Sequence, residues 1–145
     1  MMVLDTNVVS ELMRPAPSPQ VLAWLNAQTP DTLWLTSVSV AELLFGIARL
    51  PDGARKQAFV QAAKRMLDED FTNRVLVFDL EAASVFADLA ATSERAGRPI
   101  SLADGQIASI CLVHNASLVT RNEKDFTHLG VQVVNAWNTA TGVRV

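Results

Sequence analysis

Four acidic residues are placed where they could share one site. Asp5 comes directly after an apolar run, in the stretch VLDTNVVSEL that begins at residue 3. Glu42 follows the next strand-like run by five residues, and Asp125 follows a later run across a turn. Asp104 opens an apolar helical stretch instead of closing a strand. In open parallel sheets ligands bind outside the carboxyl ends of the strands, so we expect the four carboxylates to crowd one rim of the fold.

A crowded set of carboxylates favours a hard divalent cation. Like charges repel and burial adds a desolvation cost, so some of the acids must bind protons unless a cation compensates them. Mg²⁺ prefers oxygen ligands and typically takes only one or two carboxylates directly, while Mn²⁺ suits the same donors. His114, His128 and the single cysteine, Cys111, form no cluster that would favour zinc. A cation held by carboxylates acidifies bound water and stabilises a leaving oxygen, which is the chemistry of phosphodiester hydrolysis.

Each acid also has a purely structural interpretation. A serine or asparagine three residues before an acid is typical of a helix capping box. That spacing occurs at Ser39–Glu42, Ser101–Asp104 and Asn122–Asp125. Asp5 can itself cap the helix that follows it. One at a time the acids favour capping, whereas together, on one predicted rim, they favour a metal site.

The elements that must position these acids alternate between strands and helices. Short apolar runs predict strands at residues 2–4, 33–37, 74–78, 117–120 and 131–134. Helical spacing predicts helices at residues 8–13, 19–27, 39–50, 54–70, 81–96 and 102–115. Parallel strands need long crossovers, and helices supply them. We therefore expect an α/β fold, a three-layer α/β/α sandwich with a mainly parallel central sheet.

Length and composition indicate one compact domain over residues 1–145. Half of the residues are hydrophobic and 19% are charged, so a substantial core can form. No run approaches the roughly 18 apolar residues that a membrane span needs, and the first residues lack the pattern of a secretory signal. The expected location is the cytoplasm. The formal charge of −3 argues against the broad basic surface of many nucleic-acid binders.

Four motifs resemble those of the PIN-domain nucleases, in particular the VapC-type toxins of bacterial toxin–antitoxin pairs and their FitB-like branch. The motifs span nearly the whole chain and are, in order, VLDTNVVSEL, SVSVAELLFGI, SLADGQIAS and LVTRNEKDF. The resemblance implies a PIN-like fold and an endoribonuclease that depends on Mg²⁺ or Mn²⁺. Such an enzyme cuts single-stranded or loop RNA with metal-activated water and leaves 5′-phosphate and 3′-hydroxyl ends.

The resemblance also assigns roles to particular residues. It implies a catalytic metal site formed by four acids, Asp5, Glu42, Asp104 and Asp125. It implies supporting side chains that orient these carboxylates or bound waters, Thr6, Asn7, Thr120 and Asn122. Many relatives carry an aspartate where this chain has Asn122, so either Asn122 or Asp125 lies nearer to the metal.

The partners that the resemblance implies are RNA, a second copy of the toxin and an antitoxin. The antitoxin is a small DNA-binding protein whose tail covers the active site, so operator DNA is reached only through it, in a larger toxin–antitoxin assembly. The helix that begins at Ala54 either serves dimerisation and antitoxin binding or packs as an ordinary core helix. Apart from the four site acids the chain carries 12 basic and 11 acidic residues. Four arginines are candidates for phosphate contact or for ordinary surface positions, Arg14, Arg49, Arg98 and Arg121.

Two rival functions fit less well. Phosphatases that form an aspartyl-phosphate normally require a second aspartate two positions after the first, and that position holds Asn7. A non-catalytic member of the same fold, kept as a protein-binding module, would be favoured by the loss of one or more acids. All four matching positions are acidic, so a competent enzyme is the preferred hypothesis.

Overall fold

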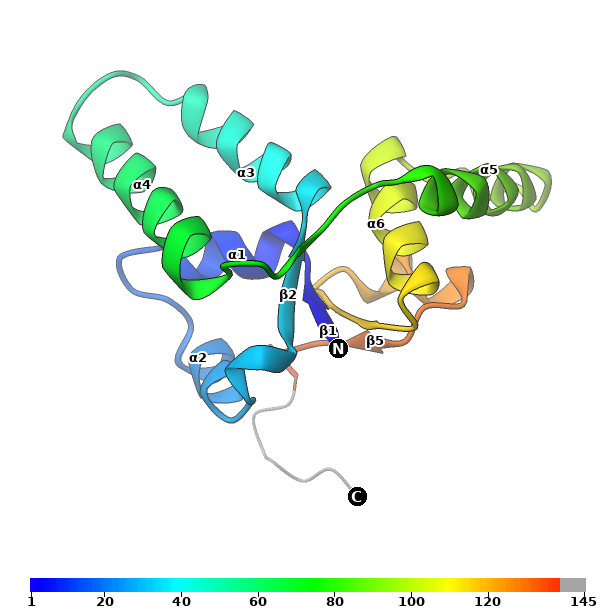
Figure 1. Cartoon of the computed structure of the whole chain (residues 1–145), viewed down its shortest axis with the longest axis horizontal. Helices are drawn as coiled ribbons and strands as arrows, with labels where there is room; N and C mark the ends of the chain where they lie inside the picture. Colours follow the sequence, from blue (N-terminus) through cyan, green and yellow to red (C-terminus); the bar gives the residue numbers. More distant parts are fainter. Residues whose placement is uncertain (139–145) are drawn as a thin grey trace.

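The computed structural model describes residues 1–138 and contains a five-stranded parallel sheet (Figure 1). The strands lie in the order β3-β2-β1-β4-β5, and all four neighbouring pairs are parallel. Their bounds are β1 Met2–Leu4, β2 Leu33–Thr36, β3 Val75–Leu76, β4 Ser117–Val119 and β5 Val133–Val134. The predicted parallel sheet is confirmed, and its carboxyl ends all meet at one edge.

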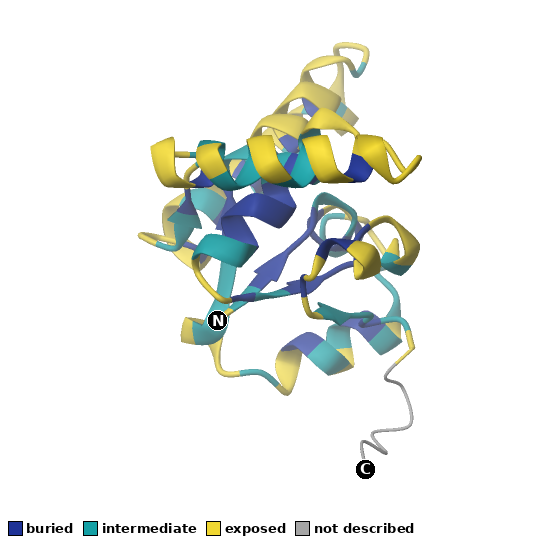
Figure 2. Ribbon diagram, turned by 90° about the vertical axis from the view of Figure 1, so that its right-hand side faces the viewer, coloured by how far each residue is buried: buried dark blue, intermediate teal, exposed yellow. Residues whose placement is uncertain are grey.

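Helices cover both faces of the sheet, which gives the predicted α/β/α sandwich (Figures 1 and 2). Their bounds are α1 Thr6–Leu12, α2 Pro19–Asn26, α3 Ser37–Ala48, α4 Ala54–Arg65, α5 Leu80–Arg95 and α6 Leu102–Val113. Shorter turns lie at Pro30–Thr32, Met66–Asp70, Glu123–Asp125 and Thr127–Leu129. Between residues 1 and 138 no helix has both the length and the apolar character needed to cross a membrane.

The alternation of side chains along the strands separates two hydrophobic cores. Leu4 and Val119 point into the core that α1 to α4 cover, whereas Val3 and Leu118 point into the core that α5 and α6 cover. Successive side chains of a strand face opposite sides of the sheet, so each strand contributes to both cores. Strands that are buried on both faces are continuous apolar runs, and this is why they could be predicted from the sequence.

The differences from the predicted elements lie at their ends. The strand predicted at 74–78 is only Val75–Leu76, because the sheet ends there and the next residue, Val77, is exposed. Helix α1 begins at Thr6, two residues before the predicted start, because Asp5 caps it. The helix predicted at 54–70 ends at Arg65 and continues as a turn of π-helix, Met66–Asp70.

Helices α5 and α6 pack closely at Gly105, the residue after Asp104. A β-carbon at Gly105 would lie 2.6 Å from Cε1 of Phe86 and 2.8 Å from Cδ1 of Ile100. The Phe86 ring cannot move away freely, because it makes an edge-to-face contact with Phe78 at 5.9 Å between centroids. The missing side chain therefore sets how closely α6 approaches α5, and with it the position of Asp104.

We predict that Gly105→Ala destabilises the protein. Overpacking of this kind costs about 1–3 kcal/mol, against a gain of about 1 kcal/mol in helix propensity. Gly46 is the matched control, because it lies within α3 and a β-carbon there meets nothing within 4 Å. Gly46→Ala should raise the free energy of unfolding by up to about 1 kcal/mol. Urea denaturation measures the free energy of unfolding of both variants. Equal increases in the two would show that the α5–α6 contact does not constrain α6.

Candidate functional site

Three of the four predicted acids line one hollow at the carboxyl edge of the sheet. The hollow has a volume of about 480 Å³. All the residues that line it have polar or charged side chains, and they are Asp5, Thr6, Asn7, Ser10, Glu11, Arg14, Glu42, Asp104 and Asn122. The structure thus brings together Asp5, Glu42 and Asp104 from segments far apart in the sequence, as the sequence predicted.

Asp5 occupies the floor of this hollow because it ends β1 and begins α1. Its backbone N–H donates to the carbonyl of Val119 at 2.9 Å, so the parallel pairing with β4 extends to this residue. Its side chain is only 5% exposed. Thr6 N–H donates to Asp5 Oδ1 at 2.8 Å, and the Thr120 hydroxyl donates to Oδ2 at 2.7 Å. The carboxylate is thereby held in one orientation by the first residue of α1 and by the residue that follows β4.

Thr120 joins Asp5 to the rest of the supporting residues. Its Oγ1 accepts from Asn7 Nδ2 at 3.2 Å and from the N–H of Asn122 at 3.1 Å. Two donors on this oxygen leave the hydroxyl proton for Asp5. Asn7 Nδ2 also donates to Asp5 Oδ2 at 3.4 Å, and its Oδ1 accepts from Arg121 N–H at 3.2 Å. Predicted supporting residues therefore do surround Asp5.

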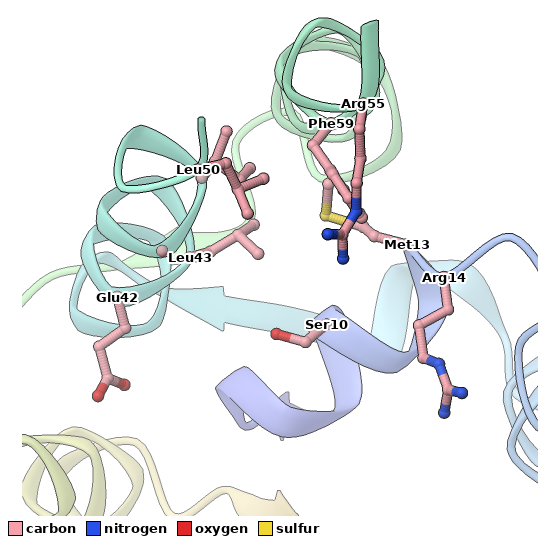
Figure 3. A pocket seen from close by; sticks show the side chains of 10 residues that line it. Ser10, Met13, Arg14, Glu42, Leu43, Leu50, Arg55 and Phe59 are labelled. Atoms are coloured by element: carbon pink, nitrogen blue, oxygen red, sulfur yellow. The ribbon is translucent and has the colours of Figure 1, made fainter. Parts of the chain in front are cut away.

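Glu42 reaches the hollow from the first half of α3. The hydroxyl of Thr6 donates to Glu42 Oε1 at 2.6 Å, which ties α3 to the start of α1. The capping interpretation of Ser39 and Glu42 is wrong, because Thr36 caps α3 by accepting from Ser39 N–H at 3.0 Å. Figure 3 shows the Glu42 carboxylate pointing away from α4 and from the apolar side chains of Leu43 and Leu50.

Asp104 comes from the first turn of α6. Ser101 caps this helix, and its Oγ accepts from Asp104 N–H at 3.2 Å, so the capping interpretation is confirmed for the serine. The capping bond uses only the backbone N–H of Asp104, so the carboxylate of Asp104 is free to line the hollow. Capping and a site role are thus compatible at this residue.

Asn122 and Asp125 are placed differently. Asn122 lines the hollow, whereas Asp125 lies on the exposed turn Glu123–Asp125 and is not part of the lining. Asp125 nevertheless lies close enough to Asp104 for its charge to contribute to the raised pKa of Asp104. The capping interpretation of this pair is wrong, since the Asn122 side chain makes no capping hydrogen bond to the turn.

The electrostatics of the hollow disfavour ionised acids when no cation is bound. Burial raises the pKa of Asp5 above its ordinary value, the hydrogen bonds from Thr120 and Thr6 partly oppose this, and the charges of Asp104 and Glu42 raise it further. The pKa of Asp104 is also raised, first by burial and then by the charges of Asp125 and Glu42. Each shift is a free-energy cost that a bound cation would remove.

The donors fit a hydrated divalent cation held by one or two carboxylates. All groups that Asp5, Glu42, Asp104 and Asn122 can offer a metal are oxygens, which suits Mg²⁺ or Mn²⁺. Across residues 1–138 no three His, Cys, Asp or Glu side chains are grouped tightly enough to hold an ion directly. Mg²⁺ keeps several waters, so the remaining carboxylates can contact it through water without moving.

The sequence prediction missed Ser10 and Glu11 as parts of the site. Together with Asn7 and Arg14 they occupy positions i, i+3, i+4 and i+7 along α1 and its end, which form one face of a helix. The signal was available as a polar stripe, but the start of the helix was placed after Asn7.

Comparisons with known proteins agree with this fold and identify the family. The sequence profile of the family described as PIN domain matches residues 2–131. The VapC ribonuclease Y4jK of Sinorhizobium fredii is 41% identical over 97% of this chain and 100% of that protein. The toxin FitB of Neisseria gonorrhoeae is 34% identical over 95% of this chain and 99% of its own. A solved structure of FitAB bound to a DNA fragment superposes with a TM-score of 0.89 at 33% identity, covering 95% of this chain and 96% of that one.

We predict that Thr120→Val weakens the site. Valine keeps the shape but removes the donor to Asp5 and the acceptor for Asn7 and for the Asn122 N–H. Leaving these groups unpaired should lower the free energy of unfolding by about 1–3 kcal/mol. Loss of an orienting partner typically lowers metal affinity about 10–100-fold. Thr120→Ser keeps the hydroxyl and is the control. Calorimetric Mn²⁺ titrations that gave equal affinities for the two variants would contradict the orienting role.

We also predict that Asp104→Asn stabilises the metal-free protein at neutral pH. The raised pKa means that Asp104 favours folding most when it is protonated, below its ordinary value of 3.8. That contribution is lost as the pH rises through the raised pKa of the folded state. The variant should therefore match the wild type at low pH and gain in relative melting temperature as the pH rises. A variant less stable than the wild type at neutral pH would show that the carboxylate acts as a helix cap.

Proposed function

Since the chain belongs to the PIN-domain family, in its VapC-type and FitB-like branch, we propose that it is a metal-dependent endoribonuclease that acts as the toxin of a toxin–antitoxin pair. One observation carries the proposal. Three acids from β1, α3 and α6 line a single hollow, and the most buried of them, Asp5, is fixed in orientation by Thr6 and Thr120. This is a preorganised set of oxygen donors at the edge where parallel sheets bind ligands.

The proposed reaction is hydrolysis of an RNA phosphodiester bond. Asp5, Glu42 and Asp104 would hold Mg²⁺ or Mn²⁺, with Asn122 as a neutral oxygen donor and Asp125 behind Asp104. A divalent cation there supplies acidified water and charge neutralisation at the phosphoryl oxygen. Water forms a new bond to phosphorus, the bond from phosphorus to O3′ breaks, and the departing oxygen takes a proton. The products are a 5′-phosphate and a 3′-hydroxyl.

The surroundings of the hollow support an antitoxin whose tail covers the active site. An apolar pocket between α1, α3 and α4 shares Ser10, Arg14 and Glu42 with the hollow (Figure 3). Phe59 and Met13 line this pocket, while Ala63 and Met66 of the same helical segment are buried in the core. The segment from Ala54 thus packs into the core on one side and leaves an apolar surface on the other. A peptide in this pocket would end beside Glu42.

The remaining parts of the proposal follow the relatives. FitB is named a toxin, and FitAB has been solved bound to DNA. We therefore propose an antitoxin that carries the contact with operator DNA, a toxin homodimer within a larger assembly, and a cytoplasmic location where RNA is accessible.

A protein-binding module without activity is the second candidate. It is favoured by one observation, that no three acids in the described part of the chain stand close enough to hold an ion without bridging waters. The buried carboxylate of Asp5 argues against it, because burying this group among other acids costs free energy that no bound cation would offset in such a module.

We predict that Asp5→Asn abolishes RNA cleavage. Wild-type protein should cut a panel of structured RNAs in the presence of Mn²⁺, and the variant should be slower by at least about 100-fold, since a metal ligand matters more than an orienting neighbour. Asp88→Asn is the matched control, because Asp88 is an exposed acid of α5 outside the hollow. A wild type as inactive as the Asp5 variant would favour the protein-binding module.

A further inference from the structure

Among residues 1–138, Arg14 is the only basic residue that lines the acid hollow. We propose that Arg14, oriented by the buried carboxylate of Glu11, is the residue that binds a phosphate of the RNA strand next to the one that is cut. The inference rests on the proposed ribonuclease function and names a substrate contact within it.

Glu11 is a buried acid whose carboxylate accepts hydrogen bonds from residues that follow α1. Its side chain is 6% exposed, although it is one of the residues that line the hollow. Glu11 Oε2 accepts from the backbone N–H of Ser18 at 2.8 Å. Arg14 Nη1 donates to both carboxylate oxygens, at 3.2 Å to Oε1 and 3.3 Å to Oε2. A buried carboxylate needs such partners, so Glu11 fixes both the loop before α2 and the guanidinium.

The bond to Glu11 leaves most of the Arg14 guanidinium available. Only Nη1 is used, and within residues 1–138 neither Nη2 nor Nε makes a hydrogen bond. The Arg14 side chain is 64% exposed. A guanidinium with a free edge matches the two oxygens of a phosphate. The buried Glu11 thus holds the guanidinium by one nitrogen and leaves its other donors in solvent, which favours a binding role for Arg14.

Arg121 is the other cation near Glu11, and it is engaged elsewhere. Its charge contributes to the lowered pKa of Glu11, which places it near that carboxylate. Its guanidinium lies over the Trp137 ring, 5.1 Å from the centroid. Arg121 is also absent from the lining of the hollow, which leaves Arg14 as the cation that faces it.

The position of Arg14 selects a neighbouring phosphate and not the one that is cut. Asp5 precedes α1 and Arg14 follows it, so the seven residues of the helix, roughly 10 Å, separate the two. Figure 3 shows Glu42 and Arg14 at opposite ends of α1, both directed away from α4. An extended strand with one phosphate at the acids would lay another along α1 toward Arg14. The carboxylates repel the phosphates of this RNA strand, whereas the guanidinium of Arg14 attracts them within the same hollow.

The test is the steady-state kinetics of RNA cleavage with Mn²⁺ and a fluorescein-labelled single-stranded RNA. Arg14→Ala and Arg14→Gln should raise KM about tenfold and leave kcat nearly unchanged, because they remove a contact made before and during the reaction. The slope of log(kcat/KM) against log salt should fall in magnitude by about 0.7, the contribution of one phosphate contact to a single strand. Glu11→Gln keeps an acceptor for Ser18 and should raise KM by a smaller factor. Arg95→Ala, an exposed arginine of α5, should change neither quantity.

The outcomes separate this inference from the function on which it rests. If the wild type cuts the RNA and both Arg14 variants keep its KM and salt slope, the phosphate contact is overturned and the nuclease stands. A fall in kcat at unchanged KM also overturns it, since the residue then acts at the reacting phosphate. If the wild type cuts no RNA, the proposed function is overturned and the inference with it. The Gln variant removes the positive charge but keeps a polar side chain with N–H donors, so it decides the matter even where Arg14→Ala loosens the loop before α2.

Discussion

The burial of one carboxylate, that of Asp5, is the constraint on which the rest of the site depends. An ionised acid at 5% exposure is costly unless donors surround it. The register of the sheet supplies them, because Leu4 pairs with Val119 and the next residues along the two strands are Asp5 and Thr120. The parallel pairing of β1 with β4 thus creates the bond from Thr120 to Asp5. The strand order of the fold therefore determines how the carboxylate at the centre of the site is hydrogen-bonded.

The crowding of acids around Asp5 depends on how the helices pack. Helix α3 brings Glu42 against Thr6, and α6 brings Asp104 into the same hollow because Gly105 allows α6 to lie close to α5. The raised pKa values of Asp5 and Asp104 measure what this costs the metal-free protein. A compact protein has no reason to keep such repulsion for stability alone, so the cost points to a cation and to the phosphates that a cation attracts. At the far end of α1 the same hollow presents Arg14, an attractive charge held by the buried Glu11.

The sequence predicted the parts of this account that depend on local pattern. Buried parallel strands are continuous apolar runs, and the acids that follow them are easily placed at one edge. The predictions failed where distant contacts decide. Glu42 pairs with Thr6, 36 positions away, and not with a cap in its own helix. The sequence left open whether Asn122 or Asp125 lies nearer to the metal. The structure places Asn122 in the lining of the hollow and Asp125 on a three-residue turn outside it, and such turns leave no periodic signal. Glu11 was missed because the helix was predicted to begin only after Asn7, which hid the polar stripe, and because its burial depends on the distant loop at Ser18.

The central claim is that the carboxylates around Asp5 are held for a divalent cation. Its most direct test is calorimetry of Mn²⁺ binding to the metal-free protein at several pH values, in buffers that differ in ionisation enthalpy. Raised pKa values mean that these acids keep their protons to a higher pH than ordinary carboxylates, so in the acidic range binding should release protons, and more of them as the starting pH is lowered. Absence of binding, or binding without any change in bound protons across the acidic range, would contradict the account.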